Sequence, residues 1–302
     1  MKQMYDFGIF LRNQYPTLNP VYDRTRAWAF SSDFDRTLQS AQMVMTGLFG
    51  PTVDTIWIQN SNLSGFYPVP IRTAPTSCDT IFRRHATCPR LIQLQSEARA
   101  SNVAVEREND AFLWEMRCSS KITLTYYDLW RLGDKALIDE AHGLVVEEYI
   151  RNNSQKLFEI RENNYFVTYL YSIDQAKIIS GGLLNQLVTY FDRKIQGSTK
   201  NELYLYSGFD FYLSGLQRLL KTSNTITQPH FGAAMLFELR NDSNNNYYVQ
   251  IKYKNNKNNE ATQLNTLSIE GCDTICPVET FKKLVQDKIS TSFEILCQSS
   301  TK

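Results

Sequence analysis

The sequence predicts an α/β fold in which a mostly helical segment is inserted between two α/β parts. Three observations lead to this fold class. A strand–turn–helix unit occurs on each side of the middle of the chain, helical patterns dominate the middle itself (residues 79–165), and a β-hairpin follows the second unit. We therefore expect one discontinuous α/β domain, made of residues 1–78 and 166–302, with residues 79–165 forming a helical cap.

The first unit is a short apolar strand, residues 28–32, followed by a helix, residues 34–49. Apolar residues of the helix recur at i, i+4, i+7, i+11 and i+14, which is one face of a helix with 3.6 residues per turn. Ser32 or Asp33 can cap its start, and Gly50 ends it. A unit of this kind places polar groups at the carboxyl edge of a parallel sheet.

The second unit is the strand at residues 203–207 with a helix at residues 212–221. Residues 234–240 and 248–254 alternate apolar and polar side chains, and an Asn-rich link joins them, which is typical of a β-hairpin with a loose polar loop. An amphipathic helix is expected at residues 277–289.

Composition excludes several classes of function. The 302 residues carry a formal net charge of +1 and are 42% hydrophobic, as in an ordinary globular protein. No basic stripe indicates a nucleic-acid partner, and no apolar run is long enough to span a bilayer. Residues 1–10 interrupt their apolar positions with polar ones, so they do not read as a signal peptide.

The cysteines favour disulfides over metal binding. There are six of them, an even number. Cys272 and Cys276 have a spacing that could begin a zinc site, but no second Cys or His pair follows at matching spacing, and the three histidines are isolated. We expect no metal and no cofactor. Three glycosylation sequons, at Asn62, Asn152 and Asn241, carry little weight in an Asn-rich chain.

Six blocks, in order along nearly the whole chain, resemble those of the histidine acid phosphatases of the prostatic and lysosomal type. The first resembles the family's R-S-T-D-x-D-R-T block, the fifth its Y-S-A-H-D block and the sixth its G-C-x-x-x-C-P block. The blocks span residues 31–40, 68–75, 87–90, 180–185, 206–216 and 271–277.

The resemblance implies a phosphoglycerate-mutase-like mixed sheet flanked by helices, with an inserted helical cap. Residues 68–75 would form a strand leading into that cap. The family's reaction is the hydrolysis of phosphomonoesters through a phosphohistidine. Arginines and a second histidine neutralise the phosphoryl oxygens, and an Asp protonates the leaving alcohol. Most of such catalysis lies in positioning and charge stabilisation.

Nearly all of that machinery is absent. No Arg-His-Gly motif occurs, and His85 falls where the family has cap sequence. Phe30 stands where the resemblance implies an arginine, and Arg26 lies ~13 Å away along an extended strand, too far to replace it. Phe209 stands where it implies the second histidine, and Asp210 alone matches the family's proton donor. Asp210 can instead serve as a helix N-cap.

The resemblance also implies disulfides and a location. It pairs Cys88 with Cys297 and Cys272 with Cys276, and we expect the two remaining cysteines, Cys78 and Cys118, to bond to each other. The family and the cysteines imply a secreted or lysosomal protein, and the resemblance leaves room for a homodimer.

Three functions remain open at this point. The chain is a catalytically inactive phosphatase-like protein, or a fragment of an acid phosphatase without its N-terminal segment, or a binding module that uses the old pocket with the two Phe rings as a wall. The missing motif belongs to a central strand in the family, and a gap there would expose unpaired backbone groups. Truncation alone does not explain Phe30 and Phe209, so even a longer chain is expected to be impaired. No ligand is predicted.

Overall fold

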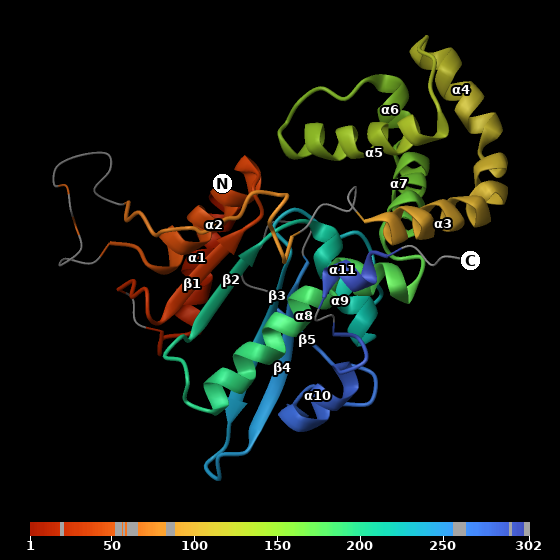
Figure 1. Cartoon of the computed structure of the whole chain (residues 1–302). Coiled ribbons are helices and arrows are strands. Elements are labelled where there is room, and N and C mark those ends of the chain that lie inside the picture. The colour runs from red at the N-terminus through yellow and green to blue at the C-terminus, as the bar shows by residue number, and fades with distance from the viewer. Residues whose placement is uncertain are drawn as a thin grey trace.

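The computed structural model describes residues 1–18, 21–51, 56, 58, 66–82, 88–255, 264–289 and 292–298. An α/β body and a helical lobe are visible in Figure 1, with the lobe, which we call the cap, above one end of the strands. The fold class expected from the sequence, a mixed α/β protein, is confirmed.

The body contains a parallel pair of strands, β1 (Ala27–Ser31) and β2 (Leu203–Ser207), which run in register from Ala27 beside Leu203 to Ser31 beside Ser207. Alternate residues of β1 are buried, which matches its apolar alternation. The strand expected at residues 68–75 is wrong in extent. It forms a single parallel bridge, in which Arg72 exchanges two backbone hydrogen bonds with the other edge of β1.

A second, antiparallel sheet begins with the expected hairpin, β3 (Ala234–Asn241) and β4 (Tyr247–Lys254). Asn245 adopts the left-handed conformation at φ 60°, which closes the turn between the two strands. The short strands β5 (Asn265–Leu267) and β6 (Cys276–Pro277) add to β4. In the described part of the chain, β2 and β3 belong to separate sheets, and each leaves one edge unpaired.

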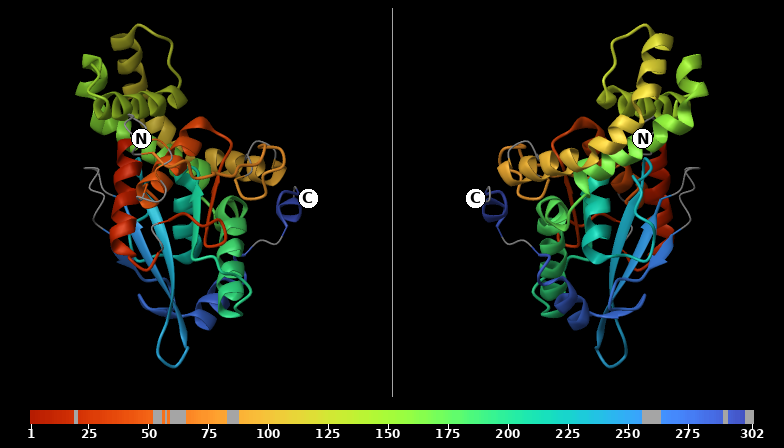
Figure 2. Two further views of the ribbon diagram at one scale, coloured as in Figure 1. Left: turned by 90° about the vertical axis from the view of Figure 1, so that its left-hand side faces the viewer. Right: turned by 90° about the vertical axis from the view of Figure 1, so that its right-hand side faces the viewer.

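Helices cover both faces of the strands (Figure 2). On one face lie α1 (Lys2–Gln14) and α2 (Asp35–Leu48), and on the other lie α8 (Ile173–Ile195) and α9 (Asp210–Leu220). Each layer forms its own apolar core against the strands. One short helix, α10 (Val278–Val285), packs beside β4, and α11 (Phe293–Leu296) lies near the start of the cap. The helix expected at residues 277–289 is shorter than predicted, because α10 ends at Val285.

Two glycines allow α1 and α2 to touch backbone to backbone. A Cβ added to Gly8 would lie 2.2 Å from the carbonyl oxygen of Val44, and one added to Gly47 would lie 2.2 Å from that of Tyr5. Neither position has room for any side chain, so these glycines set the spacing of the first helical layer.

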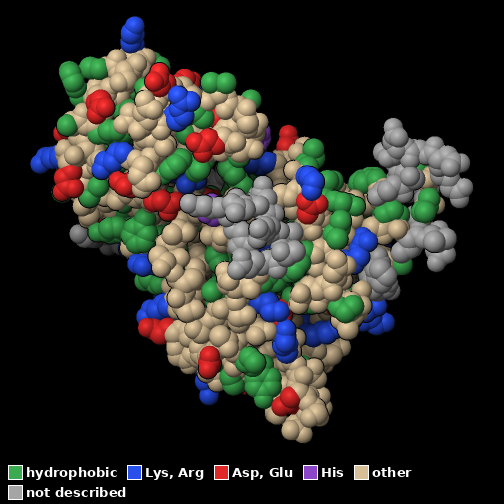
Figure 3. All heavy atoms as spheres, turned by 180° about the vertical axis from the view of Figure 1, so that it is seen from behind, with side chains coloured by type: hydrophobic (Ala, Val, Ile, Leu, Met, Phe, Trp, Pro, Cys, Tyr) green, Lys and Arg blue, Asp and Glu red, His purple; other side chains and the backbone are tan. Residues whose placement is uncertain are grey.

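The cap consists of five helices that follow one another along the chain. They are α3 (Pro89–Glu108), α4 (Asp110–Ser120), α5 (Tyr126–Ala141), α6 (Glu148–Asn152) and α7 (Ser154–Tyr169). Residues of α4 to α7 enclose a separate apolar core around Leu129 and Leu157. Charged side chains of both signs are interspersed over its surface (Figure 3).

Two of the three expected disulfides are present, Cys88–Cys297 and Cys272–Cys276, with Cα separations of 4.8 and 5.6 Å. The third expectation is wrong, because Cys78 and Cys118 are exposed free thiols. Cys78 precedes α3, whose 20 residues carry the chain about 30 Å before α4, where Cys118 lies. The sequence placed both thiols in or beside the cap but did not show that they stay unbonded.

No helix in the described residues combines the length and the apolar character needed to cross a bilayer.

Candidate functional site: the edge between the body and the cap

The turn after β1 is held by buried hydroxyl groups. The Ser32 and Thr37 hydroxyls lie 2.8 Å apart, and the Thr37 hydroxyl also lies 3.0 Å from the carbonyl oxygen of Ser32. The Ser207 hydroxyl, at the end of β2, donates to the carbonyl of Thr37 at 2.7 Å. These bonds join the first turn to the second, so the two turns form one continuous edge facing the cap.

The turn after β2 is packed by rings. Gly208 has no room for a side chain, because a Cβ there would lie 2.5 Å from the Phe82 ring. Phe209 occupies the N-cap position of α9 and packs edge-on against Phe34 at 5.1 Å and beside Phe211 at 5.4 Å between ring centroids. The helix N-cap position that the sequence analysis gave to Asp210 is therefore occupied by Phe209, and Asp210 is the first residue of α9.

Phe209 also carries a cation on its face. The Arg36 guanidinium carbon lies 4.7 Å from the Phe209 ring centroid and 5.0 Å from that of Phe34. This is cation–π geometry, which contributes about 0.5–1 kcal/mol at an exposed position. Arg36 therefore covers the ring at the position where the resemblance implies a histidine.

Phe30 has a different environment. Its ring lies 5.5 Å from Trp28, 6.0 Å from Phe82 and 6.3 Å from Tyr206 between centroids. Phe30 thus belongs to an aromatic cluster inside the body, and it lies outside the wall of the cavity described below. The two substituted positions therefore do not form one apolar wall.

Asp210 is half-buried at the start of α9. Its carboxylate accepts hydrogen bonds from the Gln228 side chain at 2.9 Å and from the backbone of Phe211 at 3.0 Å. Burial raises the pKa of the Asp210 carboxyl above its ordinary value, while these hydrogen bonds lower it by less. The backbone N–H of Gln228 in turn donates to Glu162 of α7 at 2.9 Å, so the site connects directly to the cap.

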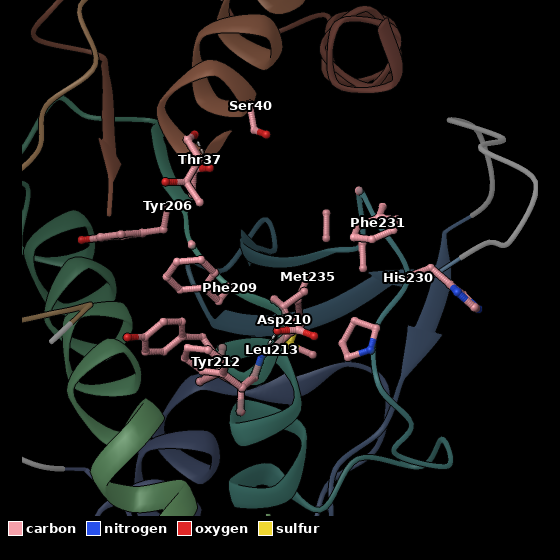
Figure 4. Close-up of a pocket in the computed structure, with 18 of the residues that line it drawn as sticks. Thr37, Ser40, Tyr206, Phe209, Asp210, Tyr212, Leu213, His230, Phe231 and Met235 are labelled. Atoms are coloured by element: carbon pink, nitrogen blue, oxygen red, sulfur yellow. Dashed lines mark hydrogen bonds between the residues drawn. The ribbon is translucent and has the colours of Figure 1, made fainter. Parts of the chain in front are cut away.

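Two of the three histidines, His142 and His230, lie among the described residues. His85 lies outside the described residues. His142 follows α5 on the cap surface, whereas His230 lines the cavity. In Figure 4 the His230 side chain points away from Asp210 and Phe209.

A cavity of about 1940 Å³ opens at this edge. It extends from beneath the cap, where Arg161 pairs with Asp134 at 3.1 Å, into the space between β2 and β3. Its wall includes Arg36 from the start of α2. Phe209 and Asp210, at the start of α9, also line it (Figure 4). No cluster of three or more His, Cys, Asp or Glu suited to a metal occurs among the described residues.

With this geometry in place, comparison with known proteins gives the family. The model of the histidine phosphatase superfamily, branch 2, matches residues 1–254, and the chain belongs to that superfamily. Rat (Rattus norvegicus) lysosomal acid phosphatase is 28% identical to it over 99% of this chain and 71% of its own length. Bovine (Bos taurus) prostatic acid phosphatase is 29% identical over 98% of this chain and 77% of its own. These relatives support the narrower placement among the histidine acid phosphatases.

Solved structures agree on the fold. The phytase of Hafnia alvei in complex with tartrate superposes with a TM-score of 0.68 at 15% identity, over 98% of this chain and 87% of that one. The phytase of Citrobacter braakii gives 0.67 at 13% identity, over 99% and 88% of the two chains.

Of the positions named from the sequence, Phe209 and Asp210 line the cavity and Phe30 does not. Sequence reasoning missed Arg36, Gln228 and His230, which also line it. Arg36 is the second residue of α2, directly after the first turn, and this position indicated that its side chain could reach the edge. Nothing in the sequence around Gln228 and His230 indicated that the loop between α9 and β3 returns to this edge.

Proposed function

We propose that this chain is a non-catalytic histidine acid phosphatase, which retains the cleft of the family but does not hydrolyse phosphomonoesters. The observation that carries the proposal is the second turn. Where the family places a histidine beside the reacting phosphate, Phe209 presents a ring that is already covered by Arg36 at 4.7 Å.

The charges around the cleft support the same conclusion. A transferring phosphoryl group is stabilised by several cations and donors that converge on its oxygens. The Arg36 guanidinium lies over the rings of Phe34 and Phe209, so it packs against aromatic faces at the turns. Arg161 lines the cavity from the cap, but Asp134 and Glu162 pair with it at 3.1 and 3.4 Å.

Asp210 can hold a proton, but without attack on phosphorus there is no leaving alcohol for it to protonate. Burial raises its pKa, which suits a proton donor to a leaving alcohol. That step follows attack on phosphorus, and no described histidine approaches the turn between Phe209 and Asp210. Removing one preorganised donor lowers rates about 100- to 1000-fold, and removing the nucleophile eliminates the covalent route.

The two disulfides and the named relatives support a secreted or lysosomal location. Disulfides persist in oxidising compartments, and the Cys88–Cys297 bridge joins segments 209 residues apart. The relatives matched over most of their length are lysosomal and prostatic acid phosphatases.

The test is turnover of an aryl phosphate by the purified protein from acid to neutral pH. We expect the rate to equal that of buffer, and Asp210→Ala to leave it unchanged. Prostatic acid phosphatase, assayed in parallel, confirms that the assay responds. Turnover that Asp210→Ala abolishes would overturn the proposal, because it would show that the carboxyl still protonates a leaving group.

A second candidate is a phosphatase completed by a further segment that carries the nucleophile. The unpaired edges of β2 and β3 favour it, since a central strand fits between them. Even this form is expected to be impaired, because Phe30 and Phe209 remain. The variant Phe209→His distinguishes the two candidates: it is expected to stay inactive in the 302-residue chain and to raise the rate only in a longer chain with an Arg-His-Gly motif.

A further inference from the structure

The helix α4 lies at the edge of the cap away from the strands (Figure 1). Phe112, Leu113 and Met116 pack into the apolar core of the cap. Because successive residues of a helix turn by about 100°, the opposite side of α4 carries Trp114 and Cys118, one helical turn apart. We call this side the outer face of α4. It consists of Ala111, Trp114, Cys118 and, just after the helix, Ile122.

The outer face of α4 is apolar and open to solvent. Trp114 is 67% exposed and Ile122 is 57% exposed. Cys118 lies between them as an exposed free thiol, one turn from each. Single exposed apolar residues are ordinary on a protein surface, but an indole, a thiol and an isoleucine in line form a continuous patch. A patch of this kind indicates an interaction surface.

The charges beside the outer face make it complementary to itself. Glu115 lies three residues before Cys118 and Lys121 three residues after it. Both are exposed, and neither forms an ion pair within the described part of the chain. When two copies of α4 meet antiparallel about a two-fold axis at Cys118, the residue n positions before Cys118 faces the residue n positions after it in the other copy.

This arrangement pairs unlike charges and joins the apolar residues. Glu115 faces Lys121 of the second copy, and symmetry repeats the pair. Trp114 faces Ile122 of the second copy in the same way. A parallel pair of helices would instead set Glu115 against Glu115 and Lys121 against Lys121, and like charges across an interface disfavour association. The outer face therefore fits an antiparallel second copy of itself.

The spacing of packed helices brings the two thiols within bonding reach. Helix axes pack about 8–10 Å apart, and each Cα atom lies about 2.3 Å from its axis. Facing Cα atoms are then about 3.4–5.4 Å apart, which overlaps the roughly 4.4–6.8 Å found across disulfides.

We propose that the outer face of α4 is a self-association surface, on which a second copy of this chain docks antiparallel and is joined by a disulfide between the two Cys118 residues. The patch has only a few residues, whereas a stable interface uses about 20–30 on each side, so the docked pair is weak until the bond forms. The indole and the charge pairs align the copies, and the disulfide makes the dimer lasting.

The oxidant is a small-molecule disulfide, for which glutathione disulfide serves as the probe. One Cys118 thiolate attacks glutathione disulfide, forms a mixed disulfide and releases one glutathione thiol. The Cys118 thiolate of the second copy then attacks the protein sulfur of this mixed disulfide and releases the other glutathione. Two protein thiols are oxidised to one disulfide, and glutathione disulfide is reduced to two thiols, which take up the two protons.

The first experiment oxidises the 302-residue chain in a buffer of oxidised and reduced glutathione, with non-reducing electrophoresis and intact mass as readouts. We expect a species of twice the 35.0 kDa chain mass, which a reductant returns to the monomer. Cys118→Ser is expected to abolish this species. Cys78→Ser removes the other exposed thiol and is the matched control, which is expected to leave the dimer unchanged.

The second experiment tests the docking separately from the thiol. Glu115→Lys sets like charges against each other and is expected to slow dimer formation about two- to fivefold. The double variant Glu115→Lys with Lys121→Glu exchanges the two charges and is expected to restore the rate. Trp114→Ala removes the largest side chain of the patch and is expected to slow dimer formation roughly tenfold.

Each rate is divided by the rate at which N-ethylmaleimide labels Cys118 in the same variant, which corrects for a changed thiol reactivity. Circular dichroism checks that the variants are folded.

Three outcomes would overturn the proposal. They are a dimer that persists in Cys118→Ser, glutathione-modified monomer as the only product of oxidation, and corrected rates that are equal in the wild type, Trp114→Ala and Glu115→Lys. Equal rates would mean that exposed thiols couple on collision without docking. A loss in Glu115→Lys that the charge exchange does not restore would contradict the antiparallel arrangement. None of these readouts involves turnover, so the inference goes beyond the proposed function and can fail without it.

Discussion

The two strand–turn–helix units lie side by side and parallel, yet their turns are stabilised by different forces. After β1, hydroxyl groups of Ser32 and Thr37 form a buried hydrogen-bonded network, which the Ser207 hydroxyl extends from β2. After β2, Gly208 and Phe209 are fixed by ring packing. The groups that hold the backbone are therefore distinct from the groups that phosphoryl transfer needs. Because of this separation, a change in the groups that phosphoryl transfer needs would leave this edge of the fold in place.

The largest expected difference between the two units is in how closely α2 and α9 pack against their neighbouring helices, α1 and α8. In Gly47→Ala, the new methyl group would meet the Tyr5 carbonyl at 2.2 Å, so two helix backbones must separate. In Gly215→Ala, it would meet the Ser180 hydroxyl at 2.2 Å, and that side chain can rotate away. We expect Gly47→Ala to lower the free energy of unfolding by about 2–3 kcal/mol and Gly215→Ala by about 1 kcal/mol.

Urea unfolding of the two variants measures this difference. In a helix interior, Ala is more stabilising than Gly by about 0.8–1 kcal/mol. Gly215 lies in the middle of α9 and Gly47 one residue before the end of α2, so this gain is larger in Gly215→Ala and adds to the expected difference. An equal loss of unfolding free energy in both variants would contradict the conclusion that α2 contacts α1 backbone to backbone.

The next effect concerns the hydroxyl network of the first turn. Thr37→Val keeps the shape of the side chain but removes the hydroxyl that bonds to Ser32. Because buried polar groups then lose their partner, we expect unfolding to become easier by about 1–3 kcal/mol. Thr37→Ser keeps the hydroxyl and serves as the control, with an expected loss of at most half that of Thr37→Val in the same urea titration. If both variants lose the same amount, methyl packing holds the turn instead.

The smallest effect is a pH dependence in the second turn. Burial raises the pKa of Asp210, so the folded protein holds this proton to higher pH than the unfolded chain does. Its contribution to stability is complete below the unfolded pKa, near 3.9, and is lost as pH rises through the folded pKa. Asp210→Asn stays neutral and can keep an oxygen toward Gln228, so its stability relative to the wild type should increase as pH rises from acid to neutral.

Chemical denaturation at a series of pH values checks this dependence, with the exposed Asp287→Asn as the control. A difference between wild type and Asp210→Asn that stays constant with pH would show that burial does not perturb this carboxyl.

Local patterns predicted most of the fold. The bounds of β2 are those expected, and α2 and the hairpin strands differ from expectation by at most one residue at each end. Each depends on periodicity within one segment. The extent of pairing at residues 68–75 and the distance between Cys78 and Cys118 depend on how distant segments pack, and these expectations were wrong.

The site shows the same limit. The substituted positions could be named from the sequence because the resemblance to the family aligns Phe30 and Phe209 with two of its motifs. The sequence did not distinguish Phe30, packed among Trp28, Phe82 and Tyr206, from Phe209, which faces the cavity. Their surroundings come from β2, α9, the start of α2 and the segment before α3, which are far apart along the chain.

The Cys88–Cys297 bridge makes residues 88–297 a closed covalent ring, from which the first part of the chain emerges as a tail. β1 belongs to the tail and β2 to the ring, so the parallel pair is a contact between two topologically distinct parts. Closing a loop with a separation of 209 residues stabilises the fold by about 5 kcal/mol in the chain-entropy model. A single proteolytic cut in the cap would open this ring without releasing a fragment. The cut would become visible only after reduction, so the cap can be nicked in an oxidising compartment while the molecule stays in one covalent piece.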